Sequence, residues 1–167
     1  TEKDAIAGIL AQETLEWDVP LVVVRGFVSE TFAFEAADAI KEQNTRGKVA
    51  HVYYFGDWDP SGVSISEDIQ RKLAGFGARL TFTRLAVTRE QIEAWRLPTR
   101  PIKRGDTRAK SWEGGECVEV DAIPARVLRQ LCREAIERHA DREAIDKLRQ
   151  AEALERRTLQ EMAETLD

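Results

Sequence analysis

The feature of this sequence that most constrains its fold is an alternation of short apolar runs with segments of helical periodicity. The runs that predict strands, rich in apolar and β-forming residues, occupy 21–24, 49–55, 80–86 and 116–120. Apolar residues recur at helical spacing over 4–16, 30–43, 63–73, 88–95 and 124–136. Such an alternation of strands and helices predicts an α/β fold with a mainly parallel sheet flanked by helices.

The 167 residues are enough for one domain with a hydrophobic core and one appended element. We assign residues 1–140 to the α/β domain. From Asp141 the sequence becomes a strongly charged helix, 141–167, whose spaced apolar residues predict packing on the domain or on a second copy in a homodimer. The first residue is Thr1 rather than Met, which leaves open that the chain is a fragment.

The composition limits the partners that the protein can bind and the environment in which it works. With 25 Lys and Arg against 30 Asp and Glu, the net charge is -5, so binding to a nucleic acid would require a local patch of positive charge. Cys117 and Cys132 have neither a C-x-x-C pair nor His ligands nearby, which argues against a zinc site and a disulfide framework. No apolar run approaches the roughly 20 residues of a membrane span. We expect a cytoplasmic protein with no membrane contact.

The sequence Asp57-Trp58-Asp59-Pro60-Ser61-Gly62 follows the second predicted strand directly. In parallel α/β sheets, ligands collect beyond the carboxyl ends of the strands. Asp57 and Asp59 can both turn toward one hard cation, and Mg²⁺ prefers oxygen ligands. The helix that starts at Ser61 offers free amides to a phosphate. The alternative is a simple turn, in which Asp59 caps the helix and Asp57 is solvated.

This arrangement resembles the Toprim domain, a Rossmann-like fold of topoisomerases, primases and overcoming-lysogenization-defect-type nucleases. The likeness rests on the D-x-D-P-x-G loop after a strand and on a downstream segment, Leu85-Ala86-Val87-Thr88-Arg89-Glu90-Gln91-Ile92-Glu93-Ala94-Trp95-Arg96-Leu97-Pro98. It covers about residues 20 to 138 and is strongest to the A subunit of topoisomerase VI and the related meiotic double-strand-break transesterases. The resemblance implies a Mg²⁺ site and a part in DNA strand cleavage and rejoining.

The resemblance also implies a Glu at the end of the first strand, as a metal ligand or as a general acid/base. Here that strand end has Arg25 instead, and the next acid is Glu30. We carry the role over to Glu30; the alternative is an exposed Glu favoured by the helix dipole in the first turn. Arg25 either holds a phosphate or neutralises the two Asp residues through a bidentate pair.

A nucleophile is missing from this pattern. Enzymes like topoisomerase VI attack DNA with a tyrosine on a winged-helix domain that precedes the Toprim domain, and no such domain is recognisable here. Tyr53 and Tyr54 lie inside a predicted strand. An upstream winged-helix domain or a partner subunit would therefore supply the tyrosine, or metal-activated water would cleave the phosphodiester.

The segment from Arg96 to Gly115, with its Pro and Gly residues, predicts a long loop. Part of it, from residue 100 to 110, collects five cations against one acid, which predicts contacts to the DNA backbone from Lys103, Arg104, Arg108 and Lys110. Trp112 could stack on an unpaired base. An ordinary solvated loop is the alternative. Glu119 and Asp121, at the end of the fourth predicted strand, would share the rim with Asp57 if that strand is parallel.

The sequence therefore supports three functions. The first is a Toprim domain that binds Mg²⁺ and cleaves and rejoins DNA with a tyrosine from elsewhere. The second is a Toprim nuclease that uses water, and the third is an inactive Toprim module that binds nucleic acid. A phosphatase-like or receiver-like α/β domain would share an acidic loop at a strand end, but the downstream segment argues against it.

Overall fold

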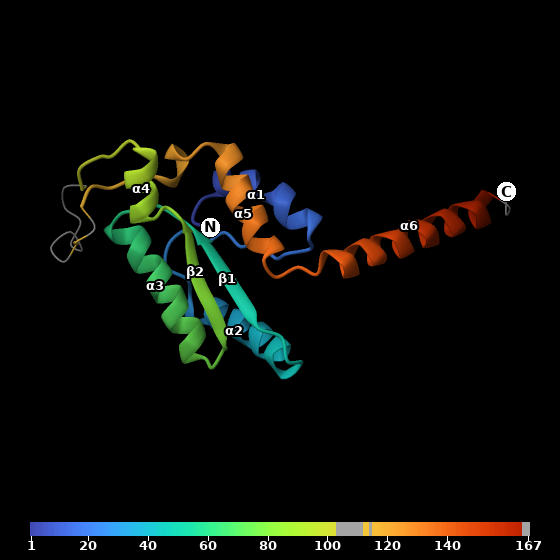
Figure 1. The fold of residues 1–167 in the computed structure, drawn as a ribbon. Coiled ribbons are helices and arrows are strands. Elements are labelled where there is room, and N and C mark those ends of the chain that lie inside the picture. The colour runs from blue at the N-terminus through green and yellow to red at the C-terminus, as the bar shows by residue number, and fades with distance from the viewer. Residues whose placement is uncertain (103–111, 114, 165–167) are drawn as a thin grey trace. The chain divides into compact units, whose positions relative to one another are not determined.

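The computed structural model describes residues 1–102, 112–113 and 115–164 of the chain (Figure 1). Two compact units are present, Thr1–Cys132 and Arg133–Asp167. The described elements are α1 (Asp4–Glu16), α2 (Glu30–Thr45), β1 (Ala50–Phe55), α3 (Pro60–Gly75), β2 (Leu80–Ala86), α4 (Arg89–Trp95), a 3₁₀ turn (Val120–Ala122), α5 (Ala125–Glu137) and α6 (Arg142–Glu164). None of the described helices combines the length and the apolar composition that crossing a membrane requires.

The sheet within the described residues consists of β1 and β2, which are parallel and joined by α3. Their register runs from Ala50 opposite Leu80 to Tyr54 opposite Arg84, with an irregularity before Phe55. The mixed α/β class is thus confirmed. The sheet is parallel, as predicted, but it is smaller than predicted, because among the described residues the runs at 21–24 and 116–120 add no strands to it.

The run 21–24 forms no strand, which corrects the prediction. The backbone N–H of Val24 donates to the Thr1 carbonyl at 2.8 Å, and the amino group of Thr1 donates to the Val22 carbonyl at 2.8 Å. The N–H of Glu2 in turn donates to the Phe55 carbonyl at 3.2 Å. The first residues of the chain therefore lie between 21–24 and the end of β1.

The run 116–120 is also not a parallel strand. It forms isolated antiparallel bridges, Trp58 with Val118 and Arg100 with Cys117, and then enters the 3₁₀ turn. The Trp58 and Val118 backbones exchange two hydrogen bonds of 2.8 and 2.9 Å. The partner of this run is thus the acidic loop after β1 rather than a neighbouring strand.

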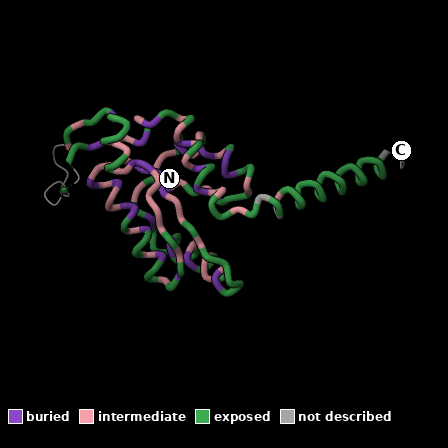
Figure 2. The backbone as a smooth tube through the Cα atoms, in the orientation of Figure 1, coloured by how far each residue is buried: buried purple, intermediate pink, exposed green. Residues whose placement is uncertain are grey.

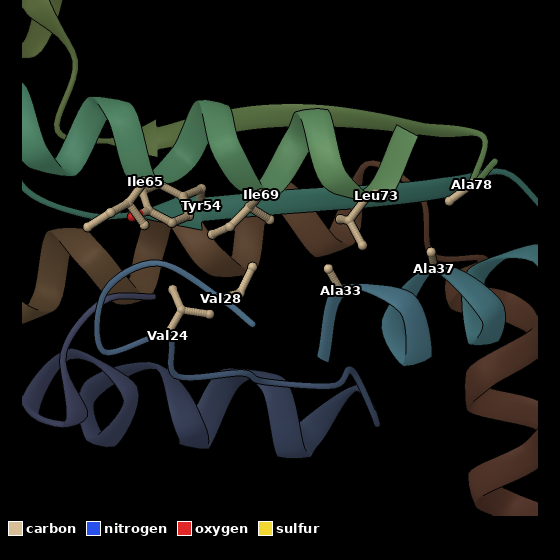
Figure 3. Close-up of a cluster of buried hydrophobic side chains, with 9 residues drawn as sticks. All are labelled: Val24, Val28, Ala33, Ala37, Tyr54, Ile65, Ile69, Leu73 and Ala78. Atoms are coloured by element: carbon tan, nitrogen blue, oxygen red, sulfur yellow. The ribbon is translucent and has the colours of Figure 1, made fainter. Parts of the chain in front are cut away.

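A hydrophobic core fills the space between α2, α3 and β1. Its residues are Val24, Val28, Ala33, Ala37, Tyr54, Ile65, Ile69, Leu73 and Ala78, and Figure 3 shows those of α3 facing α2 and the segment before it. The amphipathic spacing of α2 and α3 supplies the two apolar faces. Ser29 caps the start of α2, since its side chain accepts a hydrogen bond from the Phe32 N–H at 3.1 Å.

One buried polar residue ties the starts of the two strands together. The Asn44 side chain, near the end of α2, donates to the carbonyls of Lys48 at 3.1 Å and Arg79 at 3.0 Å. It also accepts a hydrogen bond from the Arg79 N–H at 3.0 Å. These contacts join the segments that lead into β1 and β2, so Asn44 helps to set the register of the sheet.

The second unit contains α6. Figure 2 shows this helix almost entirely exposed.

Candidate acidic site at the end of strand β1

The acidic loop lies where the sequence predicts it, directly after β1. Pro60 opens α3, which Asp59 caps by accepting a hydrogen bond from the Gly62 N–H at 2.7 Å. Pro suits the first helical position because it has no N–H to leave unpaired. Ser61 follows in the first turn. Asp59 thus has the capping role that the alternative interpretation gave it. The cap uses one of its carboxylate oxygens, and the second oxygen forms no bond among the described residues.

Asp57 is held from two sides and is largely buried, with 16% of its side chain exposed. Its Oδ1 accepts a hydrogen bond from the Val120 N–H at 2.9 Å. The same oxygen lies 3.2 Å from the Lys3 ammonium. The second oxygen of Asp57 forms no bond among the described residues.

Glu2 is an acid of this site that the sequence analysis did not identify. Its Oε2 accepts a hydrogen bond from the Asp57 N–H at 2.9 Å. Burial raises the pKa of Glu2, and the negative charges of Asp57 and Asp59 raise it further, against the hydrogen bond and the charge of Arg84. Glu2 therefore lies at the carboxyl end of β1, within electrostatic reach of both Asp residues.

Two glycines make room for this carboxylate. A Cβ atom on Gly56 would overlap Oε2 of Glu2 and would lie 2.6 Å from the ring of Tyr54. A Cβ atom on Gly62 would lie 2.5 Å from the Asp57 carbonyl oxygen and 3.2 Å from the same Oε2. Gly56 is thus favoured by the close packing of Glu2 and Tyr54, and Gly62 chiefly by the close approach of the Asp57 backbone.

The three acids share one feature: a backbone N–H fixes one oxygen of each carboxylate. Mg²⁺ prefers such oxygen ligands and keeps several waters, so one or two carboxylates are enough to bind it. The donor set of Glu2, Asp57 and Asp59 fits this ion. Within the described residues, however, no three acidic, His or Cys side chains already form a metal-ligand cluster. A bound ion would therefore require the carboxylates to adjust.

Lys3 contributes a positive charge to this rim. Its Nζ lies 2.6 Å from Asp121 and 4.0 Å from Glu119, besides its contact with Asp57. Burial acts to lower the pKa of Lys3, but the bonds to Asp121 and Asp57 outweigh it and raise the pKa. Glu119, which also pairs with Arg100, and Asp121 thus reach the predicted rim. They do so through the antiparallel bridge and the 3₁₀ turn.

Tyr54, in β1, and Arg84, in β2, lie next to the acidic loop. The Arg84 guanidinium is 5.0 Å from the centre of the Tyr54 ring and 6.0 Å from that of Trp58. The Tyr54 side chain is 3% exposed, and its hydroxyl has no hydrogen-bond partner among the described residues. Burial raises the pKa of Tyr54, and the charge of Glu2 adds to this, so the hydroxyl is protonated at neutral pH.

Two residues predicted for the site lie elsewhere. The Glu30 carboxylate pairs with Lys72 at 3.1 Å and is 70% exposed. Lys72 is in the last turn of α3, whereas Asp59 caps the first turn, which at about 1.5 Å per residue separates them by roughly 20 Å. Arg25 forms a bidentate pair with Asp4, at 2.7 and 2.8 Å, rather than with the acidic loop. The structure thus brings neither Glu30 nor Arg25 to Asp57 and Asp59.

The basic segment is only partly described. Lys103, Arg104, Arg108 and Lys110, predicted to contact DNA, lie outside the described residues. Trp112, which follows them, packs edge to face on Trp58 with 5.5 Å between ring centres. Its indole N–H donates to the Gly115 carbonyl at 2.7 Å. An aromatic pair therefore lies beside the acidic loop.

Comparisons of the chain with protein-family models, curated proteins and solved structures gave no match. The site must therefore be judged from its own residues. Glu2, Lys3 and Arg84 were missed by the sequence analysis. A signal existed only for Arg84, a cation inside a run that otherwise predicts a strand.

Proposed function

We propose that this chain is a Mg²⁺-binding Toprim-type module that acts on nucleic-acid phosphodiesters, with Glu2, Asp57 and Asp59 as the metal-binding acids. The observation that carries the proposal is the set of three carboxylates at the end of β1, each with one oxygen held by a backbone N–H. The resemblance calls for a Glu at a strand end beside the D-x-D loop. Glu2 belongs to no strand, but its carboxylate lies beside the D-x-D loop at the end of β1, and we assign the role to it rather than to Glu30.

Each residue would have a distinct role in this function. Asp57 and Asp59 would bind the ion through the oxygens that their backbone contacts leave over. When bound, Mg²⁺ neutralises charge on the phosphate and stabilises the leaving oxygen, which is worth several kcal/mol in such sites. Glu2, with its raised pKa, would bind the ion or exchange a proton with the reacting oxygen.

The nucleophile would not be a tyrosine of the described sheet. Tyr54 is the tyrosine nearest the acids, but it is buried and its raised pKa opposes attack as a phenolate. Cleavage would then use water, as in a nuclease, or a tyrosine from a winged-helix domain or a partner subunit. We expect the chain alone to form no covalent DNA adduct.

A second candidate is an inactive module that binds nucleic acid without a metal. The position of Lys3 favours it, since the ammonium already neutralises Asp57 and Asp121. In this case Lys3 would take the place of the metal ion, and the loop would serve only as a rigid rim.

Calorimetric titration with Mg²⁺ tests the first proposal, with nicking of supercoiled plasmid measured on the same samples. Glu2→Gln, Asp57→Asn and Asp59→Asn are expected to reduce Mg²⁺ affinity by at least about 10-fold, because each removes a ligand charge. Glu30→Gln is the matched control and should bind like the wild type. Loss of nicking in the same variants would support a nuclease, and Mg²⁺ binding without nicking would support an enzyme that lacks its nucleophile.

Two results would contradict the metal site. Equal Mg²⁺ binding by the wild type and the three site variants would place the ion elsewhere. A wild type that binds oligonucleotides but no Mg²⁺ would support the inactive module with Lys3 as its internal cation.

A further inference from the structure

Arg84 is bound to both ends of the acidic loop. From β2, its Nη1 donates to the carbonyls of Gly56 at 3.1 Å and Asp57 at 3.0 Å. Its Nη2 donates to the Gly62 carbonyl at 2.7 Å and to the Ser66 hydroxyl at 3.0 Å. One side chain thus connects the end of β1, the D-x-D motif and the first turns of α3.

The partners of this guanidinium are unusual for a buried charge. Three acids lie near enough to act on Arg84 electrostatically, namely Glu2, Asp57 and Asp59. Nevertheless, no carboxylate among the described residues forms an ion pair with it, and its hydrogen bonds go to backbone carbonyls and one hydroxyl. Buried charges usually pair with opposite charges. This arrangement leaves the carboxylates available and uses the fork of the guanidinium to fix the backbone.

We infer that Arg84 is a positioning residue for the acidic site: its planar fork holds the carbonyls of Gly56, Asp57 and Gly62 and so keeps the loop that carries the acids in place at the end of β1. The Asp57 and Gly62 residues that it holds are also those whose N–H groups bind Glu2 and Asp59. Lysine could not replace this contact pattern, because an ammonium is a point charge without the rigid fork. The role as a metal-site residue rests on the function proposed above.

Charge and geometry make opposite predictions for this residue. A positive charge near a cation site repels Mg²⁺, so removal of Arg84 should tighten binding if its charge alone matters. If Arg84 positions the loop, its removal should weaken binding, although the repulsion is lost. A purely structural role would lower stability without changing the Mg²⁺ affinity of the molecules that remain folded.

The first test is Mg²⁺ calorimetry on Arg84→Gln and Arg84→Lys below their unfolding temperatures. Both should bind Mg²⁺ roughly 10- to 100-fold more weakly than the wild type, the usual loss when an outer-shell partner is removed. Arg79→Gln, an exposed cation just before β2, is the control and should bind normally. Tighter or equal binding by Arg84→Gln, or full affinity in Arg84→Lys, would overturn the inference.

A second test needs no metal: amide hydrogen exchange at Asp57, Gly62 and Val120, whose N–H groups bind the three carboxylates. In Arg84→Lys these amides should exchange faster, while those in the middle of α2 keep their protection. Unchanged exchange at the three amides would overturn the positioning role. A wild type that does not bind Mg²⁺ would refute the proposed function, but the exchange rates would still decide whether Arg84 organises the loop.

If both Arg84 variants fail to fold, Ser66→Ala provides the milder change. It removes one acceptor of the guanidinium and leaves the three acids untouched. Faster exchange at the Gly62 amide is expected, with a Mg²⁺ affinity a few-fold lower. If Ser66→Ala folds and its Gly62 amide exchanges at the same rate as in the wild type, the inference is contradicted.

Discussion

The surroundings of Glu2 disfavour the ionised form of its carboxylate. Burial and the neighbouring Asp57 and Asp59 raise its pKa, so the folded state holds a proton on Glu2 more tightly than the unfolded chain does. The stabilisation from protonated Glu2 is then fully present below its ordinary pKa of about 4.5 and is lost as the pH rises through the higher folded pKa. Ionisation of Glu2 therefore opposes folding.

Glu2→Gln should raise the melting temperature at pH 7 and weaken its dependence on pH above about 4.5. The amide oxygen of Gln can still accept the hydrogen bond from Asp57, while the repulsion of two neighbouring acids disappears. Thermal unfolding between pH 4 and pH 8 measures this, with Glu67→Gln, exposed on α3, as the control. A lower melting temperature for Glu2→Gln at pH 7 would contradict the electrostatic account. If Glu2→Gln is more stable than the wild type but no longer binds Mg²⁺, Glu2 serves function at the expense of stability.

The helices were predictable because their signals are local. Ser29 and Thr88 cap α2 and α4, and Pro60 opens α3, each within one turn of the residues it affects. The two strands that pair in the sheet were predictable for a similar reason, since each is a β-rich run next to a turn. The runs 21–24 and 116–120 are also rich in β-forming residues, but their partners are Thr1 and Trp58, which no local sequence pattern indicates.

The same distinction applies to the candidate site. Asp57 and Asp59 were predictable because a strand, a D-x-D motif and a helix start follow one another directly. Glu2 was not, because its contact with Asp57 spans 55 positions. The first acid after the run 21–24, Glu30, was chosen instead, and it pairs with Lys72. Closeness along the chain was thus a poor guide to the third acid.

Between elements, Asn44 offers a test of how the register of β1 and β2 is set. Asn44→Ala would leave the Lys48 and Arg79 carbonyls and the Arg79 N–H without their partner in a partly buried site. We expect a loss of about 2–3 kcal/mol in the free energy of unfolding, because unsatisfied buried groups cost about 1–3 kcal/mol each and water recovers part of it. Denaturant unfolding measures the loss. Gln70→Ala, exposed on α3, should change it by less than about 0.5 kcal/mol.

At the scale of the whole molecule, the second unit contributes α6, a charged helix whose described side chains are mostly exposed. Leu148, Leu159 and Met162 are exposed on α6 and lie within one stripe, since they are three turns and one turn apart. Exposed apolar stripes on charged helices are typical of helix-to-helix association. We expect a second copy of the chain to cover this stripe.

Sedimentation of the full chain measures that association. The double substitution Leu159→Glu and Met162→Glu should shift the protein toward the monomer, whereas Gln150→Glu, exposed on the same helix, should not. The Mg²⁺ affinity of the double variant should equal that of the wild type, because all three acids belong to the first unit. A wild type that is monomeric at high concentration would refute the role of α6 in self-association.

The contact between Glu2 and Asp57 also links the site to the completion of folding. A chain that has formed its helices and its two strands, but has not yet brought its first residues to the end of β1, contains the D-x-D loop without the third acid. An ion held by all three acids would bind the finished fold more tightly than this intermediate, and at 100 times its dissociation constant it would favour the finished fold over a non-binding unfolded chain by about 2.7 kcal/mol. Mg²⁺ would thus stabilise the completed fold, because its full affinity would require the contact between Glu2 and Asp57.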